Sequence, residues 1–291
     1  MARILIVAKQ SKYEYERKKF ELSHEEIIAK YSAERANLEA ILQSHDGQLK
    51  TRLTLQELLP DARLIMMDQL KEQILDYDMV ISLGGDNSFI YVTHFIGNIP
   101  ILGINSDPRR STGALCAVTA NSIERVAKSI QNEKFRIENW TRLQATIDGK
   151  LITPATSEYF FGEKLRKDMS RHILIYRGKE YEQKSSGIII ATGAGSTGWY
   201  DSANRFSWPG GDRFDKTEQK AAFIVTEPYR YVALPSDVHA SYILAGEELI
   251  LHSLNDGDGY ATADSWEEFD FSRGRKAVIR ISDKPLKIII P

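Results

Sequence analysis

Short apolar runs and helically spaced apolar positions alternate through the first half of the chain. The segments 3–9, 78–83 and 100–105 are mainly apolar and are bounded by polar or turn residues, which is typical of buried strands. Apolar side chains in 89–95 and 122–131 recur at the spacing of a helix with one buried face. This alternation of strands and helices predicts a parallel α/β sheet.

A further helix is predicted between the first two strands. Ser23 and Glu26 have the spacing of a capping box, which opens a helix. Apolar residues follow at helical spacing from Ile27 to Leu42, so we expect one continuous helix through this segment. Nine of the fifteen residues in 12–26 are charged, and we interpret these charges as a solvated face.

The second half of the chain has a different texture, with short strand-like segments separated by turn residues. These segments are Leu143–Ile147, His172–Tyr176, Gly187–Thr192, Ala222–Thr226, Glu248–His252 and Lys276–Ile281. We therefore expect an α/β domain over residues 1–138 and a β-rich, β-sandwich-like domain over 139–291. The last ~25 residues are a candidate to return to the first domain.

Composition narrows the class of protein. Of the 291 residues, 42% are hydrophobic and 27% are charged, as in soluble globular proteins. The 38 Lys and Arg nearly balance the 40 Asp and Glu, so we do not expect nucleic acid as a partner. No apolar run exceeds five residues, whereas a membrane-spanning helix needs about 20. The N-terminus has no secretory pattern, and we expect a cytoplasmic protein.

Cysteine and histidine positions indicate no metal site. Cys116 is the only cysteine, which excludes an internal disulfide and a cysteine-built zinc site. The six histidines show no metal-ligand spacing, so we name no metal ligand.

A glycine-rich turn follows the second predicted strand, in the sequence Gly84-Gly85-Asp86-Asn87-Ser88. Ligands of open α/β sheets gather at the carboxyl ends of strands, and two glycines let the backbone approach a phosphate closely. The carboxylate of Asp86 could handle a proton or Mg²⁺. A tight turn with a capping aspartate is the alternative interpretation.

A second glycine-rich segment follows the apolar residues 188–191. Gly193, Gly195 and Gly198 satisfy the G-x-G-x-x-G pattern of a dinucleotide-binding turn. The pattern lies in the β-rich half instead of an α/β unit, which disfavours a dehydrogenase and leaves a nucleotide-binding turn open.

Together the two turns resemble the NAD kinase family. Residues 84–88 resemble its GGDGT element, residues 195–199 resemble its GSTAY element, and Ser157-Glu158 stands where the family has an Asn-Glu pair. Further segments look closest to the mitochondrial-type branch of the family: Ser157–Glu163, Lys184–Gly187, and Gly103–Pro108 with Arg110-Ser111.

The resemblance implies a nucleotide-binding α/β domain, a β-rich NAD-binding domain and a homodimer or homotetramer. It implies Mg²⁺-dependent phosphate transfer from ATP to the adenosine ribose 2′-hydroxyl of NAD, giving NADP, with Asp86 as the general base. Glu158 is then expected to hold ribose hydroxyls, and Thr197, Gly198 and Trp199 to line the adenosine pocket. The other positions expected at the nucleotides are Gly84, Gly85, Asn87, Ser88, Asn105, Ser157, Ser186, Gly195 and Ser196.

The sequence also departs from the family pattern at positions expected to face substrate. Asn87 replaces a glycine, although asparagine tolerates a left-handed backbone. Ser157 replaces the asparagine that recognises adenine, and serine has one donor where the amide has two. Ser186 replaces an aspartate, Ser88 a threonine and Gly198 an alanine. Two alternatives therefore stay open: a phosphotransferase of the same fold with another hydroxyl acceptor (a nucleoside, sugar or lipid), and a non-catalytic dinucleotide-binding protein.

Overall fold

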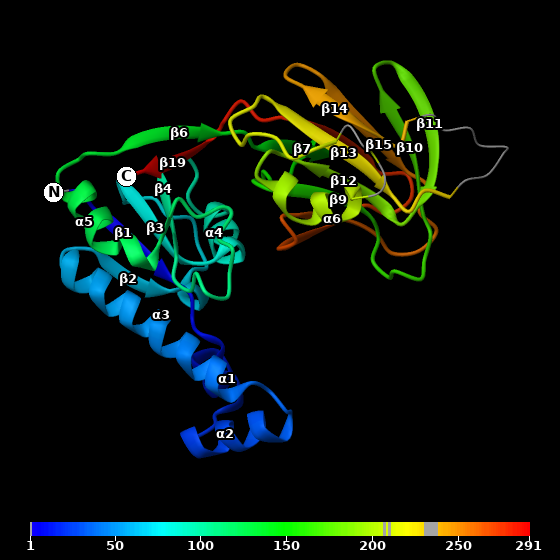
Figure 1. Cartoon of the computed structure of the whole chain (residues 1–291). Coiled ribbons are helices and arrows are strands. Elements are labelled where there is room, and N and C mark those ends of the chain that lie inside the picture. The colour runs from blue at the N-terminus through cyan, green and yellow to red at the C-terminus, as the bar shows by residue number, and fades with distance from the viewer. Residues whose placement is uncertain (1, 206–207, 209–210, 230–237) are drawn as a thin grey trace. The chain divides into compact units, whose positions relative to one another are not determined.

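The computed structural model describes residues 2–205, 208, 211–229 and 238–291. They form two units, which are considered separately (Figure 1). The first unit extends to Glu138 and includes Lys287–Pro291, and the second is Asn139–Leu286.

The first unit contains a seven-stranded sheet in the order β2-β1-β3-β4-β19-β6, with β5 also paired to β4. The pairs of β1 with β2 and β3, and of β4 with β3, β5 and β19, are parallel. All residues of β3 and β4 are buried, as expected for parallel strands covered on both faces. The strands are β1 Ile4–Ala8, β2 Arg63–Met66, β3 Met79–Gly84, β4 Ile101–Asn105, β5 Val118–Thr119, β6 Arg136–Trp140 and β19 Leu286–Ile290.

The helices of the first unit correct one prediction. The capping box of Ser23 and Glu26 is present, but the helix that it opens does not continue to Leu42. It ends at Ala33, Arg35 adopts a left-handed conformation, and the side chain of Asn37 caps a new helix. The prediction of a single helix was therefore wrong. Apolar residues of two successive helices, among them Ile27, Tyr31 and Ile41, belong to one cluster, and this explains why the helical spacing of apolar residues continues across the break. The helices are α1 Lys12–Phe20, α2 His24–Ala33, α3 Leu38–Leu58, α4 Asp86–Thr93 and α5 Ile123–Gln131, with 3₁₀ turns η1 Met67–Gln69 and η2 Ala120–Ser122.

The second unit consists of two six-stranded antiparallel sheets, so the predicted α/β and β-rich fold class is confirmed. Their orders are β11-β10-β15-β18-β7-β8 and β14-β13-β12-β9-β16-β17. One hydrophobic cluster contains residues of both sheets, such as Leu174 of β10 and Phe223 of β13. The strands are β7 Leu143–Ile147, β8 Lys150–Leu151, β9 Glu158–Glu163, β10 Ser170–Tyr176, β11 Lys179–Ser185, β12 Gly187–Ala191, β13 Lys220–Thr226, β14 Ala240–Leu244, β15 Glu248–Ser253, β16 Gly259–Ala263, β17 Glu267–Asp270 and β18 Lys276–Ile281.

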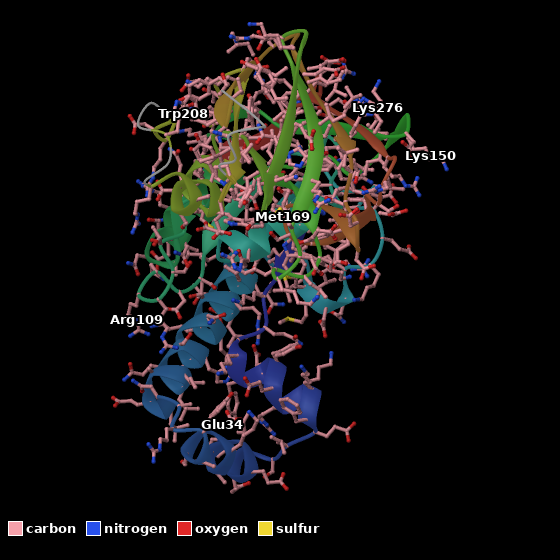
Figure 2. All side chains as sticks on the ribbon, turned by 90° about the vertical axis from the view of Figure 1, so that its right-hand side faces the viewer. Glu34, Arg109, Lys150, Met169, Trp208 and Lys276 are labelled. Atoms are coloured by element: carbon pink, nitrogen blue, oxygen red, sulfur yellow. The ribbon has the colours of Figure 1, made fainter. Side chains whose placement is uncertain are left out.

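Burial alternates along strands of the first of these two sheets, which contains β7 and β10. Buried and half-buried positions alternate along β7 and β10, the pattern of a sheet with one solvated face. Charged side chains such as Lys150 and Lys276 point outward (Figure 2). All residues of β9 and β12 are buried, because a short helix, α6 Trp199–Asn204, covers the second face of their sheet through Tyr200. The 3₁₀ turn η3, Gly195–Thr197, leads into it.

No helix among the described residues is both long enough and apolar enough to cross a membrane.

Candidate active site

The first glycine-rich turn connects β3 to α4 at the point where the strand order of the sheet reverses. β1 pairs with β2 on one side and with β3 on the other, so the chain passes from one side of β1 to the other between β2 and β3. In open α/β sheets the carboxyl ends of strands at such a switch point are the usual ligand site. Gly84 ends β3, and Asp86 begins α4 immediately afterwards.

The two glycines are required by close packing around the turn. A Cβ on Gly84 would lie 2.5 Å from Ser88 Oγ, and one on Gly85 would lie 3.0 Å from Ser111 Oγ. Ser88 is therefore buried against the turn, whereas Asn87 is exposed. Gly85 provides no side-chain cap for α4, so backbone N–H groups of its first turn are available to an anion.

The carboxylate of Asp86 is held by a loop of the same unit. Oδ2 accepts a hydrogen bond from Ala114 N at 3.0 Å, and Oδ1 accepts one from Leu115 N at 2.8 Å. A carboxylate has about four lone-pair sites, so these two bonds orient the group and leave it able to accept more. Asp86 is partly exposed, which keeps it accessible.

Asn105 shapes the same loop and is buried away from solvent. Its side chain is buried, its Nδ2 donates to Ser111 O at 2.8 Å, and its Oδ1 accepts from Asp107 N at 3.1 Å. The structure thus brings Asn105 close to the turn as a residue that orders the loop around Asp86.

Lys9 is a residue that the sequence reasoning missed. Its backbone N donates to Leu83 O at 2.8 Å, and its Cβ lies 3.2 Å from the position that a Cβ on Gly84 would take. Its side chain is exposed, and no ion pair among residues 2–205, 208, 211–229 and 238–291 involves it. The sequence offered one signal for it. Lys9 directly follows the first strand, and parallel strands bring their carboxyl ends to the same end of the sheet, where the glycine-rich turn also lies.

The second unit places Ser157 and Glu158 at the beginning of β9, beside the other glycine-rich segment. Both residues are buried, and the Ser157 hydroxyl donates to Glu158 Oε2. Glu158 pairs with Ala191 of β12, and the chain then continues into the glycine-rich segment.

Burial changes the acidity of Glu158. Desolvation and the neighbouring negative charge of Asp264 raise the pKa of Glu158 to about 7, against the effect of the hydrogen bond from Ser157. The carboxyl group therefore changes its protonation near neutral pH.

The glycine-rich segment after β12 packs directly on this pair of residues. A Cβ on Gly195 would lie 2.2 Å from the backbone oxygen of Ser157, so only glycine fits. Thr192 connects the two segments, because its hydroxyl donates to Thr156 O at 2.6 Å and accepts from Ala194 N. Ser196 and Thr197 donate their hydroxyl groups to Gly193 O and Ala194 O within the same turn.

This geometry excludes the dehydrogenase turn. A Rossmann turn joins a parallel strand to a long helix. β12 is antiparallel to both β9 and β13, and α6 has six residues.

Trp199 provides an aromatic surface next to Glu158. Its ring stacks on Phe160 with centroids 4.9 Å apart and an interplanar angle of 24°, and Trp199 remains 41% exposed. Phe160 and Glu158 are two residues apart on β9, so their side chains share one face of the strand. A carboxyl group and an exposed ring on one face are suited to a ribose and a base. Gly198 is also exposed, next to the ring.

Ser186 lies on the Phe160 side of this group and away from Thr192, because a Cβ on the next residue, Gly187, would lie 2.4 Å from the Phe160 ring. It precedes β12, whereas Thr192 follows β12, and a strand of this length separates its two ends by roughly 17 Å. The Ser186 hydroxyl donates to Glu227, which also pairs with Arg166.

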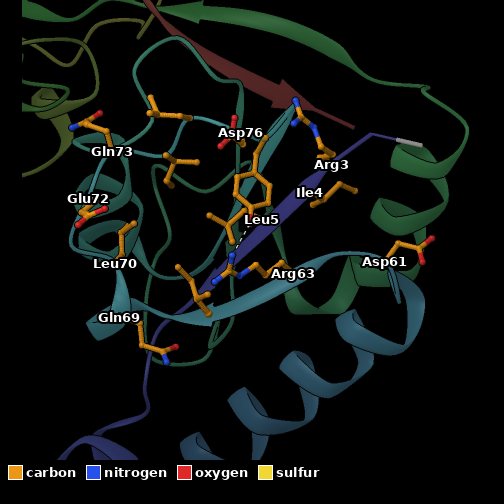
Figure 3. Close-up of a pocket in the computed structure, with 14 residues that line it drawn as sticks. Arg3, Ile4, Leu5, Asp61, Arg63, Gln69, Leu70, Glu72, Gln73 and Asp76 are labelled. Carbon is orange, nitrogen blue, oxygen red and sulfur yellow. Dashed lines mark hydrogen bonds between the residues drawn. The ribbon is translucent and has the colours of Figure 1, made fainter.

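A cavity of about 740 Å³ in the first unit is lined by residues of β1, of β2 and of the segment 69–77 (Figure 3). Arg3 and Arg63 line it at the amino ends of β1 and β2, and Arg63 donates to Tyr77 Oη at 3.4 Å. The residues that line this cavity do not include Gly84, Gly85 or Asp86 of the turn.

Comparisons with known proteins find NAD and NADH kinases. No protein-family model matches the chain. It is 31% identical over 168 residues to a probable NADH kinase of Oryza sativa, covering 50% of this chain and 52% of that protein. It is 31% identical over 192 residues to an NAD kinase of Bacteroides fragilis, covering 62% and 64%. The chain thus spans between about half and two thirds of the length of these relatives.

The structural comparison covers nearly the whole chain. A crystal structure of an NAD kinase from Archaeoglobus fulgidus in complex with ATP matches with a TM-score of 0.67 at 17% identity, over 98% of this chain and 92% of that one. The α/β unit and the two antiparallel sheets therefore define the NAD kinase fold. In sequence the chain is similar to NAD and NADH kinases over part of its length, and in fold it is similar to an NAD kinase.

Proposed function

We propose that the protein transfers a phosphoryl group from ATP to the adenosine ribose 2′-hydroxyl of NAD, giving NADP. The observation that carries the proposal is the turn at the switch point, where the partly exposed carboxylate of Asp86 lies near the uncapped N-terminus of α4. The ATP complex of the matched structure and the names of the relatives agree with this activity.

The donor phosphates bind at the turn between β3 and α4. Backbone N–H groups of the first turn of α4 and the ammonium group of Lys9 meet the negative oxygens. Mg²⁺ usually binds through substrate phosphates and one or two carboxylates. Asp86 is the carboxylate at this turn and has lone pairs to spare, so the residues present fit an ATP–Mg²⁺ complex.

Asp86 is the general base in this proposal. A ribose hydroxyl is far less acidic than an aspartic acid, so Asp86 accepts the proton only as the oxygen–phosphorus bond forms. The bond between the γ-phosphorus and the bridging oxygen breaks, and ADP leaves. The two hydrogen bonds from Ala114 and Leu115 fix the direction of the carboxylate.

The acceptor nucleotide binds on the face of β9 in the second unit. Glu158 accepts hydrogen bonds from ribose hydroxyls, and the Trp199 ring, supported by Phe160, stacks on adenine. The hydroxyl of Ser157 is directed to Glu158, so adenine contacts at this position differ from those of an asparagine amide.

The direct test incubates the whole protein with ATP and Mg²⁺ and with NAD or NADH, and measures the 2′-phosphorylated dinucleotide. Both NAD and NADH are tested because one relative is named an NADH kinase and the other an NAD kinase. Formation of NADP or NADPH supports the proposal. Phosphorylation of another hydroxyl compound alone, or dinucleotide binding without turnover, contradicts it and favours one of the two alternatives. Light scattering on the same sample tests the expected homodimer or homotetramer.

A further inference from the structure

Asp264 is a buried carboxylate that binds three successive backbone N–H groups far away in the sequence. Its Oδ2 accepts from Thr156 N at 2.9 Å, and its Oδ1 accepts from Ser157 N at 2.7 Å and from Glu158 N at 3.0 Å. Its own N donates to Glu158 O at 2.9 Å. Only 4% of Asp264 is exposed, so its carboxylate oxygens bind backbone N–H groups and not solvent.

The backbone at Asp264 is itself unusual. Asp264 has φ +52° and the next residue, Ser265, has φ +59°, both in the left-handed region, which aspartate tolerates better than serine does. The turn after β16 therefore accepts local strain, and the three hydrogen bonds to the start of β9 compensate for it.

Asp264 also brings a second negative charge to the interior beside Glu158. Its charge adds to the effect of burial on the pKa of Glu158. The hydroxyl group of Ser157 acts in the opposite direction. The guanidinium of Arg142, which is buried and donates to Pro154 O at 2.9 Å, and the phenol of Tyr159 also interact electrostatically with Asp264.

We propose that Asp264 is a positioning residue of the acceptor site, which fixes the Thr156–Glu158 backbone and places its negative charge beside the carboxyl group that receives the ribose. This inference rests on the proposed function, because the role of Glu158 as the ribose ligand comes from there. Two separable contributions follow: an anchor made of three hydrogen bonds, and a charge that determines how readily Glu158 gives up its proton.

Two substitutions separate the anchor from the charge. Asp264→Asn removes the charge, tolerates the left-handed backbone and keeps an oxygen for Ser157 N and Glu158 N, although its amide group then faces Thr156 N. Asp264→Gly also tolerates the backbone but removes all three acceptors. Ser265→Gly is the matched control, because Ser265 is exposed and has the same backbone conformation.

The kinetic test measures kcat and the KM for NAD between pH 5.5 and 8.5. We expect Asp264→Gly to raise the KM for NAD by ~10-fold or more at every pH, with a smaller change in kcat. The wild-type KM is expected to rise as pH falls through about 7, where Glu158 takes up its proton. Asp264→Asn should move that rise to lower pH, because Glu158 has lost its negative neighbour. An unmoved pH profile in Asp264→Asn, or a KM in Asp264→Gly equal to that of Ser265→Gly, overturns the proposal.

A second measurement does not depend on kinase activity. The free energy of unfolding is measured against pH for the wild type, Asp264→Asn, Glu158→Gln and the double variant. Coupling between the two carboxyl groups predicts that Asp264→Asn has different effects with and without Glu158, and that the difference grows above pH 7. Purely additive effects refute the coupling. If the wild type forms no NADP, the proposed function fails, while this cycle still decides whether Asp264 and Glu158 are coupled. If Asp264→Asn does not fold alone, its effect is measured in the Glu158→Gln background, where the charge of Glu158 is absent.

Discussion

Asp86 and Asp264 both accept hydrogen bonds from backbone N–H groups, yet their surroundings give them different roles. Asp86 accepts two such bonds, is partly exposed, and lies where the first turn of a helix leaves N–H groups free. Asp264 accepts three bonds and is only 4% exposed, so its oxygens are occupied by the backbone. The same chemical group is suited to catalysis in one place and to positioning in the other, and burial with the number of free lone pairs decides between them.

The strongest test of this comparison is Asp86→Asn. We expect kcat to fall by about 10²–10⁴-fold, because the amide cannot accept the proton of the ribose hydroxyl. The amide oxygen still accepts from Leu115 N, so the KM for NAD should change little, whereas the KM for ATP should rise because the carboxylate that fits the ATP–Mg²⁺ complex has lost its charge. Steady-state assays of NADP formation measure both quantities. Asp61→Asn, at an exposed aspartate that lines the cavity shown in Figure 3, is the control. Full activity in Asp86→Asn would remove this residue from the mechanism.

Glu158→Gln tests the second unit without an activity assay. The pKa of Glu158 lies above its usual value, so the folded protein holds this proton more tightly than the unfolded chain does. The stability that comes from this proton is present below about pH 4.5 and is lost as pH rises towards 7. At pH 8, Glu158→Gln should therefore unfold at a higher urea concentration than the wild type, with a free energy of unfolding greater by up to about 3 kcal/mol. Near pH 4.5 the two free energies of unfolding should differ little.

The control for this experiment is Glu180→Gln, at an exposed position of β11 in the same unit. A gain in stability of the same size at both pH values would show that packing, and not ionisation, is responsible.

Trp199→Ala should have a smaller effect, confined to the acceptor. Stacking of a base on an aromatic ring contributes about 1–3 kcal/mol, so we expect the KM for NAD to rise by ~10-fold or more while the KM for ATP and kcat stay the same. Trp199→Tyr should restore most of the affinity. Tyr15→Ala, at an exposed aromatic residue of the first unit, serves as the control. An unchanged KM for NAD in Trp199→Ala would exclude the ring from the acceptor site.

Lys9→Met should have the smallest effect, on the donor alone. An exposed ammonium group contributes modestly, and we expect the KM for ATP to rise by ~5–10-fold, more at low salt than at high salt. The KM for NAD should not change. Lys50→Met removes a cation that lines a different cavity of the same unit. Equal effects of the two substitutions would indicate a general attraction of ATP by positive charge and contradict a specific role of Lys9.

Local sequence patterns predicted much of the fold. The apolar runs that became β1, β3, β4, β7 and β18 were recognisable because strands buried by their neighbours need uninterrupted or alternating apolar side chains. The helical segment after Ser23 was misjudged because periodicity cannot show whether two successive apolar stretches share one axis. Arg35 and Asn37 separate them, and the two helices still fill one cluster.

The sequence by itself determined that a glycine-rich turn with an aspartate follows a buried strand, and that a second glycine-rich segment follows another, because both features are local. Only the tertiary structure decided what surrounds them. Lys9 reaches Gly84 through the parallel pairing of β1 with β3, and Asp264 reaches Glu158 across 106 positions through the pairing of β9 with β16. Strand pairing sets these distances, and it depends on the packing of whole sheets, which no short segment encodes.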